Sequence, residues 1–421
     1  MTPSTRATLP QVIALGCTQT LAWASSTYLP AILAAPIAQE LDISRANVFG
    51  AFSIALILTG LGGPVVGRLI DRHGGRGMLA ASNLVFAAGL LMLGLAPNGL
   101  MMLAAWCVLG AAMAMGLYDA AFAALVRLHG KHAREPITGI TLIAGFASTV
   151  GWPLTAYLAE HFGWRASCFV WAAMHLCIAL PVNLRFIPGI KAGAIAIDSA
   201  HTTPATPHSD EPDKAQHAAA TDISLSAKPQ SERLAFWLLA VFAAATSFVT
   251  SAMAAHLPGL LLAAGASAAA ALTAAALLGP AQVAARLAEF MTARRFGFHP
   301  LASARVATAL HPIGVVVLAL IGGAPFAAAA FAMLHGAGNG MITIAKGTLP
   351  LAIFGSAGYG YRQGLLNVLA RGAQAFAPFA FGLTLDKHGV GAGIALSGGI
   401  SLVALLALMM LRKGSKGSKG S

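Results

Sequence analysis

Charged side chains are scarce in this chain, because Asp, Glu, Lys and Arg together occupy only 10% of its 421 positions. A water-soluble domain carries about 25% charged residues. Hydrophobic residues make up 57% of the sequence, and the mean hydropathy is +0.75. The composition excludes a soluble globular protein and indicates an integral membrane protein.

Cysteine and nucleotide-binding motifs are also scarce. The four cysteines, Cys17, Cys107, Cys168 and Cys177, each lie in an apolar run and form no CxxC pair, which favours buried apolar residues over a metal or redox site. The chain lacks the GxxxxGK[ST] loop that binds nucleotide phosphates, so ATP-driven transport is not expected. We expect neither catalytic residues nor a metal or other cofactor.

Long apolar runs, by contrast, are abundant. About 20 apolar residues in a helix cross the ~30 Å hydrocarbon core of a membrane, and these runs are continuously apolar, whereas barrel strands alternate. The sequence therefore predicts an all-α membrane protein with twelve transmembrane helices in two pseudo-symmetric halves. The runs lie near residues 9–36, 46–70, 77–97, 99–126, 137–159, 165–187, 234–262, 267–292, 300–322, 325–347, 363–384 and 390–411.

A polar segment divides these runs into six and six. Residues 188–233 cannot bury enough apolar surface to order themselves. We predict an N-terminal half over residues 1–187, a disordered cytoplasmic linker over 188–233, a C-terminal half over 234–411 and a flexible tail over 412–421.

Short matches relate the two halves. Their near-constant offsets indicate a duplication, which is typical of transporters that bind substrate near the membrane midplane. An alternative register would lay Arg68 to Asp71 on Arg286 to Glu289. The matched segments are Tyr28 to Pro30 with His256 to Pro258 at an offset of 228, Asp71 to Gly74 with Arg294 to Gly297 at 223, and Glu160 to Gly163 with Asp386 to Gly389 at 226.

Basic residues collect on one face of the predicted bundle. Only Arg45, Arg165 and Lys387 fall on the other face, and Arg286 and Arg371 fall inside spans. The positive-inside rule assigns the basic face to the cytoplasm, so we expect a multi-pass monomer in the inner cell membrane with both termini cytoplasmic. The net charge of +12 is a topology signal and gives no reason to expect nucleic-acid binding.

The turn between the second and third runs reads Gly67-Arg68-Leu69-Ile70-Asp71-Arg72-His73-Gly74-Gly75-Arg76. Glycines allow a sharp turn, and the arginines hold it at the cytoplasmic face. We expect a gate here, in which Asp71 accepts hydrogen bonds from helix termini or arginines. The predicted gating residues are Gly67, Asp71, Arg72 and Arg76, with Arg294 and Arg295 after the eighth run.

This turn is similar to the signature of the major facilitator superfamily between helices 2 and 3, and Phe162-Gly163-Trp164-Arg165 resembles its pattern between helices 5 and 6. The resemblance covers the chain apart from linker and tail, and it implies the major facilitator fold. Two positions depart from it. Trp106 stands four residues before Gly110, where many members have arginine, and Gly151-Trp152-Pro153 interrupts the glycine-proline pair of many drug antiporters.

Within that superfamily, the eighth run resembles the monocarboxylate-transporter and oxalate–formate-exchanger group. The resemblance implies that Arg286 in helix 8 and Arg371 in helix 11 meet substrate carboxylates. Gln282 stands where some members have an acid, and the lysine that those members carry in helix 1 is missing.

Charges inside the apolar runs mark candidate sites, because each costs several kcal/mol at bilayer depth. Asn367, Arg371 and Gln374 recur at i, i+4 and i+7 and share one helical face. The guanidinium of Arg371 can bind a substrate carboxylate through two hydrogen bonds. The alternative is that Arg371 pairs with an acid on a neighbouring helix.

Gln282, Arg286 and Glu289 share one face of the eighth run in the same way. Arg286 either contacts substrate, with Gln282 beside it, or pairs locally with Glu289 at i+3. The first, seventh and tenth runs add Tyr28, His256 and Asn339 as expected substrate contacts.

Asp119 is the acid that lies well inside an apolar run. Burial favours the protonated form of a carboxyl group, so Asp119 could carry a coupled proton. A permanent ion pair with Arg371 or Arg286 is the alternative. His256 and His335 are further candidate proton sites because imidazole titrates near neutral pH, although a membrane histidine also serves as a helix–helix hydrogen bonder.

Together these residues predict a proton-coupled secondary transporter of a small organic anion, a carboxylate, that works by alternating access. Lys346, near the cytoplasmic end of the tenth run, is expected to extend toward water instead of binding substrate. A drug or metabolite exporter with a mainly apolar pocket is the first alternative, in which the arginines are structural. A non-transporting membrane sensor that uses the linker as its output is the second. The expected partners are the small-molecule substrate, protons and the lipid bilayer.

Overall fold

The structure, a computed structural model, describes residues 3–189, 231–322 and 324–412. Within these residues every regular element is helical. Most of the predicted linker, residues 190–230, and of the predicted tail, residues 413–421, lie outside the described part of the chain.

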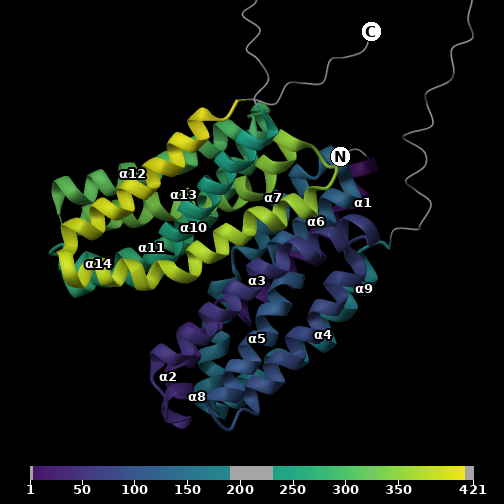
Figure 1. Ribbon diagram of the computed structural model, residues 1–421, viewed down its shortest axis with the longest axis horizontal. Helices are drawn as coiled ribbons and strands as arrows, with labels where there is room; N and C mark the ends of the chain where they lie inside the picture. Colours follow the sequence, from purple (N-terminus) through teal and green to yellow (C-terminus); the bar gives the residue numbers. More distant parts are fainter. Residues whose placement is uncertain (1–2, 190–230, 323, 413–421) are drawn as a thin grey trace, which may run out of the picture.

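The helices fall into two groups, one before and one after residues 190–230 (Figure 1). The N-terminal half contains α1 (Pro3–Ala24), α2 (Leu29–Glu40), α3 (Arg45–His73), α4 (Gly75–Gly94), α5 (Gly99–Gly116), α6 (Tyr118–His129), the short turn η1 (Gly130–His132), α7 (Arg134–Ala144), α8 (Ala147–Met174), the π-helical turn η2 (His175–Ala179) and α9 (Leu180–Phe186). The C-terminal half contains α10 (Glu232–Ala263), α11 (Ala268–Phe296), α12 (Pro300–Ile321), α13 (Pro325–Phe354) and α14 (Tyr359–Met410).

Ten helical stretches of the described residues are long and apolar enough to cross a membrane. Two of them, Arg134–Phe186 with 53 residues and Tyr359–Met410 with 52, are far longer than one crossing needs. Each contains a glycine with non-helical backbone, Gly163 at φ 83° and Gly389 at φ 77°, and Figure 1 shows α14 turning back on itself. Dividing both stretches at these glycines gives twelve segments; that count stays a prediction.

The helix boundaries repeat with the offset of 223 that the sequence suggests. Helices α3 and α11 each have 29 residues. Ser44 and Ser267 accept a backbone N–H of the first turn at 3.1 and 3.2 Å, and Gly74 and Gly297 end the two helices with positive φ. A serine cap satisfies an otherwise unpaired N–H group, and glycine adopts positive φ without strain. The same start and stop residues therefore specify both helices.

Each half packs around its own apolar side chains. Trp106 and Phe86 are fully buried in the N-terminal half, and Phe331 and Phe381 in the C-terminal half. Trp106 stands edge-on to Phe52 with ring centroids 5.3 Å apart. The tryptophan that replaces the expected arginine of the fourth run is thus a core residue.

The two halves touch at the end of the molecule where α1 begins and α9 ends, and they diverge toward the other end (Figure 1). We refer to the touching end as the closed end. There α3 packs along α14, and a Cβ atom on Gly63 would lie 3.1 Å from the carbonyl oxygen of Gly364. A Cβ atom on Gly67 would collide with the carbonyl of Gly360. Small residues let the two backbones approach closely, so glycine is required along this contact.

Two interruptions of the predicted spans bear on the site, besides the one between α7 and α8 in the fifth run. The first run breaks between α1 and α2, where Pro30 lies in the first turn of α2. The fourth run breaks at Leu117, whose backbone is extended at φ −83° and ψ −174°. The second break places Asp119 in the first turn of α6 instead of in the middle of a continuous helix.

Candidate functional site

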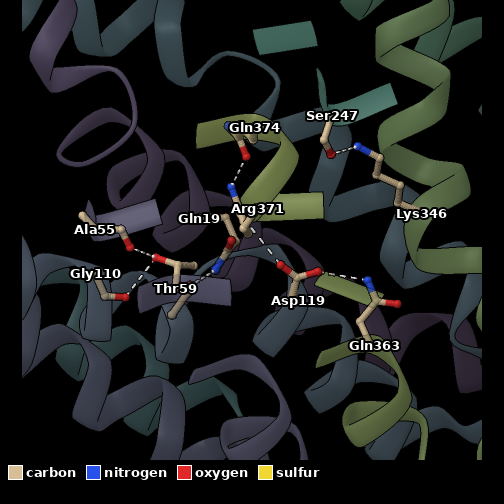
Figure 2. Close-up of polar contacts among 11 residues, drawn as sticks. Gln19, Ala55, Thr59, Gly110, Asp119, Ser247, Lys346, Gln363, Arg371 and Gln374 are labelled. Atoms are coloured by element: carbon tan, nitrogen blue, oxygen red, sulfur yellow. Dashed lines mark hydrogen bonds and ion pairs between the residues drawn. The ribbon is translucent and has the colours of Figure 1, made fainter. Parts of the chain in front are cut away.

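An ion pair joins the two halves at their contact. Nη2 of Arg371 on α14 lies 3.6 Å from Oδ2 of Asp119 on α6, and the two side chains are 7% and 20% exposed (Figure 2). Asp119 sits at the N-terminus of its helix, where the helix dipole stabilises a carboxylate. The break at Leu117 therefore positions an anion to face the arginine of the other half.

Amide side chains complete the ion pair. Nε2 of Gln363 donates to Oδ1 of Asp119 at 2.9 Å, and Nη1 of Arg371 donates to Oε1 of Gln374 at 2.9 Å. The guanidinium of Arg371 also lies 5.8 Å above the ring of Trp23. Gln374 thus contacts Arg371 as their spacing predicts, whereas Asn367, half-buried one turn earlier, has no side-chain hydrogen bond within the described residues.

Several buried polar atoms beside this pair have no hydrogen-bond partner in the described part of the chain. They are Nε of Arg371, Nε1 of Trp23, Oε1 of Gln363 and Oε1 of Gln19. Leaving such a group unpaired costs about 1–3 kcal/mol. Native proteins keep few buried polar groups unpaired. Four such atoms around one ion pair therefore mark the position at which a polar ligand would be bound.

Lys346 is a correction to the sequence analysis, because its side chain does not extend toward water. Its ammonium group donates to Oγ of Ser247 at 2.8 Å (Figure 2). This bond crosses from α13 to α10, and the charge acts electrostatically with Arg371 and Asp119. Inside the bundle, the hydroxyl of Ser247 takes the place that water was expected to take beside the ammonium group.

Arg286 is buried and donates to backbone carbonyls. Its Nη1 donates to Thr141 of α7 at 3.0 Å, its Nε donates to Gly340 of α13 at 3.2 Å, and its Nη2 approaches Oε1 of Gln282 at 3.5 Å. The alternative of a local pair with Glu289 is not seen; Glu289 acts electrostatically with Arg134 of the N-terminal half. Arg286 therefore forms a second bridge between the halves.

His256 contacts the backbone of α14. Pro378 has no N–H group, which leaves the carbonyl of Gln374 without its helical donor, and Oγ of Ser251 donates to that carbonyl at 2.8 Å. Nε2 of His256 lies 2.8 Å from the carbonyl oxygen of Pro378. Both contacts attach α10 to α14 within the C-terminal half, where His256 takes the helix–helix bonding role.

The other predicted residues of the C-terminal half also lie at helix contacts. Oδ1 of Asn339 accepts the hydroxyl hydrogen of Thr250 at 2.9 Å. His335 stacks on His311 with ring centroids 4.5 Å apart, and both rings are buried between α12 and α13. His311 has no protein partner for either ring nitrogen in the described residues. The sequence offers the same signal for His311 as for His335, a histidine inside an apolar run, but does not show that the two rings meet.

The predicted gate lies at the closed end. Oδ1 of Asp71 accepts the backbone N–H of Gly360, and Oδ2 accepts that of Tyr361, both at 2.9 Å. Nε of Arg127 donates to the Asp71 carbonyl at 3.0 Å, and the Arg68 guanidinium lies 4.9 Å from the ring centroid of Tyr361. Asp71 thus binds the first turn of α14, where unpaired N–H groups attract an anion.

The remaining predicted gating arginines do not reach Asp71. Arg72 and Arg76 are exposed on either side of the turn, and Arg294 and Arg295 are exposed in the last turn of α11. The second contact across the closed end instead comes from Arg134, whose Nη1 donates to the carbonyl of Phe298 at 2.5 Å.

Replacing Asp71 by Asn tests the contact with α14. The amide keeps one acceptor oxygen but turns its NH₂ group toward a backbone donor, so one of two charge-assisted bonds is lost. We expect uptake to slow roughly ten-fold while the order of preference among substrates stays unchanged. Initial uptake rates in proteoliposomes measure both quantities.

Asp42→Asn is the matched control, because Asp42 lies in the turn between α2 and α3 at the opposite end of α3. Its backbone φ of 50° suits asparagine equally well, so uptake should keep its rate. A changed substrate preference in Asp71→Asn would show that the gate assignment is wrong.

Comparison with known proteins gives a consistent result. The family model described as Major Facilitator Superfamily matches residues 15–345. The human organic anion transporter MFSD10 (TETRAN) has a similar structure, with a TM-score of 0.70 at 15% identity over 97% of this chain and 100% of that chain. The proton:xylose symporter XylE, bound to 6-bromo-6-deoxy-D-glucose, gives 0.68 at 14% over 96% and 95%. FucP in its outward conformation gives 0.65 at 14% over 94% and 97%. At these identities the solved structures show the fold alone.

Proposed function

This chain belongs to the Major Facilitator Superfamily, and on that premise we propose that it carries a small organic carboxylate across the membrane together with protons. Members of this superfamily are secondary transporters that move small molecules across a lipid bilayer. The family therefore supports a multi-pass membrane carrier over an enzyme. The inner-membrane location, the cytoplasmic termini and the monomeric state remain predictions.

The observation that carries the proposal is the ion pair between Arg371 and Asp119, which spans the two halves. Near the contact between the halves, the C-terminal half supplies three cations, Arg286, Lys346 and Arg371. The N-terminal half supplies the carboxylate of Asp119. The excess of positive charge attracts an anion. Arg371 stays charged at every relevant pH and matches the two oxygens of a carboxylate.

Proton coupling follows from competition for the same guanidinium. While Asp119 is ionised, it occupies Arg371 as a substrate carboxylate would. A proton taken up by Asp119 removes its charge and releases Arg371, which can then bind the substrate with two charge-assisted hydrogen bonds. Proton and anion are therefore bound together, which makes the transport a symport.

Alternating access requires the two halves to separate at the closed end. That movement breaks the bonds of Asp71 to α14 and of Arg134 to Phe298. Two solved structures with this fold are described as an organic anion transporter and a proton:xylose symporter, so the fold accommodates both kinds of transport.

Proteoliposomes containing the full chain test the proposal. We expect an imposed pH gradient, acid on the side of uptake, to drive accumulation of a radiolabelled carboxylate above its equilibrium level. Purified protein should also show a higher melting temperature with carboxylates present, since ligands that bind the folded state stabilise it. Stabilisation by lipophilic cations and not by carboxylates would favour the drug-exporter alternative.

A further inference from the structure

Four aromatic side chains of the N-terminal half, Trp23, Tyr28, Tyr118 and Trp152, form a group that we call the aromatic cluster. The ring centroids of Trp23 lie 5.0 Å from Tyr118 and 6.3 Å from Tyr28, and Trp152 stands edge-on to Tyr28 at 5.6 Å. The indole N–H of Trp152 donates to the Tyr28 carbonyl at 3.2 Å.

Interruptions of the helices place two of these rings. Tyr28 lies in the break between α1 and α2, and Tyr118 begins α6 directly after the extended Leu117. Tyr118 is thus the immediate neighbour of Asp119. Trp152 is the residue that separates Gly151 from Pro153, the pair that stands adjacent in many drug antiporters. The breaks in the first and fourth predicted spans thus position the rings of Tyr28 and Tyr118.

The aromatic cluster adjoins the cations of the other half. The guanidinium of Arg371 lies 5.8 Å from the centre of the Trp23 ring. The charge of Arg286 acts electrostatically on the phenols of both Tyr28 and Tyr118. A ligand held by these arginines therefore has aromatic rings beside it.

Packing alone does not explain the cluster. Trp152 is 43% exposed although its indole N–H donates to the Tyr28 carbonyl. Among the described residues, Nε1 of Trp23 is buried without a hydrogen-bond partner, as is Nε of Arg371 next to it. Two unpaired N–H donors around one guanidinium suit a ligand with two acceptor oxygens.

The two halves meet this ligand with different chemistry. The C-terminal half offers the charges of Arg371 and Lys346, whereas the N-terminal half offers the aromatic cluster. A ligand that satisfies both surfaces has a negatively charged end and a flat apolar body.

We propose that the transported anion is an aromatic carboxylate, with its carboxylate on Arg371 and the Nε1–H of Trp23 and its ring against the aromatic cluster. The inference rests on the proposed function and names its substrate class. Aromatic rings attract one another edge-to-face or offset because of their quadrupoles, so an aromatic body gains more here than a saturated ring of the same size.

Benzoate and cyclohexanecarboxylate form the test pair, because they share the carboxylate and differ in ring aromaticity. Binding to the purified full chain is measured by titration calorimetry. We expect benzoate to bind roughly 2- to 10-fold more tightly, the factor that one aromatic contact supplies. Benzyl alcohol, which keeps the ring and lacks the charge, should bind far more weakly than either.

Two variants separate the ring contact from the hydrogen bond. Trp152→Leu removes an accessible ring and should reduce the preference for benzoate toward parity. Trp23→Phe keeps a ring and removes the N–H, so it should weaken both carboxylates by a similar factor. Trp237→Leu, a 52% exposed tryptophan of α10, is the control and should leave the preference unchanged.

The outcomes distinguish the two proposals. Equal affinity for both carboxylates in the wild-type chain would overturn the aromatic assignment and leave the carboxylate transporter standing. Absence of binding by any carboxylate would overturn the proposed function and this inference with it. Benzyl alcohol binding as tightly as benzoate would show that the rings serve uncharged ligands and would overturn both.

Discussion

Arg371→Gln should abolish carboxylate uptake, by a factor of 100 or more. The substitution removes the charge and the paired donors that hold the substrate, and a buried charge-assisted contact of this kind is worth about 3–5 kcal/mol when one partner is removed. Uptake of a labelled carboxylate into proteoliposomes measures the effect. Arg371→Lys keeps the charge but loses the bidentate geometry, so partial activity is expected from it.

Loss of folding must be separated from loss of binding. In Arg371→Gln the carboxylate of Asp119 remains buried without its cation, which destabilises the fold. Arg371→Gln combined with Asp119→Asn removes both charges and should recover the melting temperature without recovering uptake. Arg305→Gln is the matched control, since Arg305 donates to the carbonyls of Leu408 and Met409 in α14 and of Leu411 just after it; this variant should transport normally. Full uptake by Arg371→Gln would refute the carboxylate site.

Asp119→Asn should separate anion transport from the proton gradient. Asparagine has nearly the shape of aspartate but cannot release a proton, so the variant resembles the protonated carrier at every pH. In the wild type, carboxylate binding should weaken as the pH rises, because ionised Asp119 competes for Arg371. The variant should bind equally well across the same pH range, exchange labelled for unlabelled substrate, and fail to accumulate it against a gradient.

Glu289→Gln is the control for this prediction. Glu289 is a buried acid of α11 that acts electrostatically with Arg134. The variant Glu289→Gln should retain the wild-type pH dependence of carboxylate binding. If the pH dependence disappears in Glu289→Gln and persists in Asp119→Asn, the proton is carried on α11 and the competition described above does not occur.

Local spacing predicted some of these contacts from the sequence. Arg371 and Gln374 are three residues apart, so helical periodicity alone places them together. Gly74 and Gly297 take the same place in the repeat that the sequence suggests after the second and eighth runs, and each follows the last residue of its helix with positive φ. Periodicity and capping are short-range effects, and the sequence displays them directly.

Hydrogen-bond and ion-pair partners that come from distant segments of the chain could not be predicted from local spacing. Hydropathy does not reveal which helices adjoin, so the sequence leaves open whether Asp119 carries a proton or pairs with an arginine. Gln363 was overlooked as the first residue of a predicted span, although it donates to Asp119. The break at Leu117 could not be recognised in a run that is apolar on both sides. The side chain of Lys346 turns into the bundle because it donates to Ser247 of another helix, which the sequence of its own helix does not show.

Helix α14 has a mechanical consequence for the empty carrier. It binds Asp71 through Gly360 and Asp119 through Arg371, and these positions are about 16 Å apart along one rigid helix. Opening the closed end must therefore also separate the buried ion pair, at a cost of order 3–5 kcal/mol. While Asp119 is ionised, a carrier without substrate would then reorient roughly a hundred-fold or more less often than a loaded one. The same proteoliposomes should show faster dissipation of a pH gradient, in the absence of substrate, in Arg371→Gln, which keeps the proton-carrying Asp119 and removes its ion-pair partner.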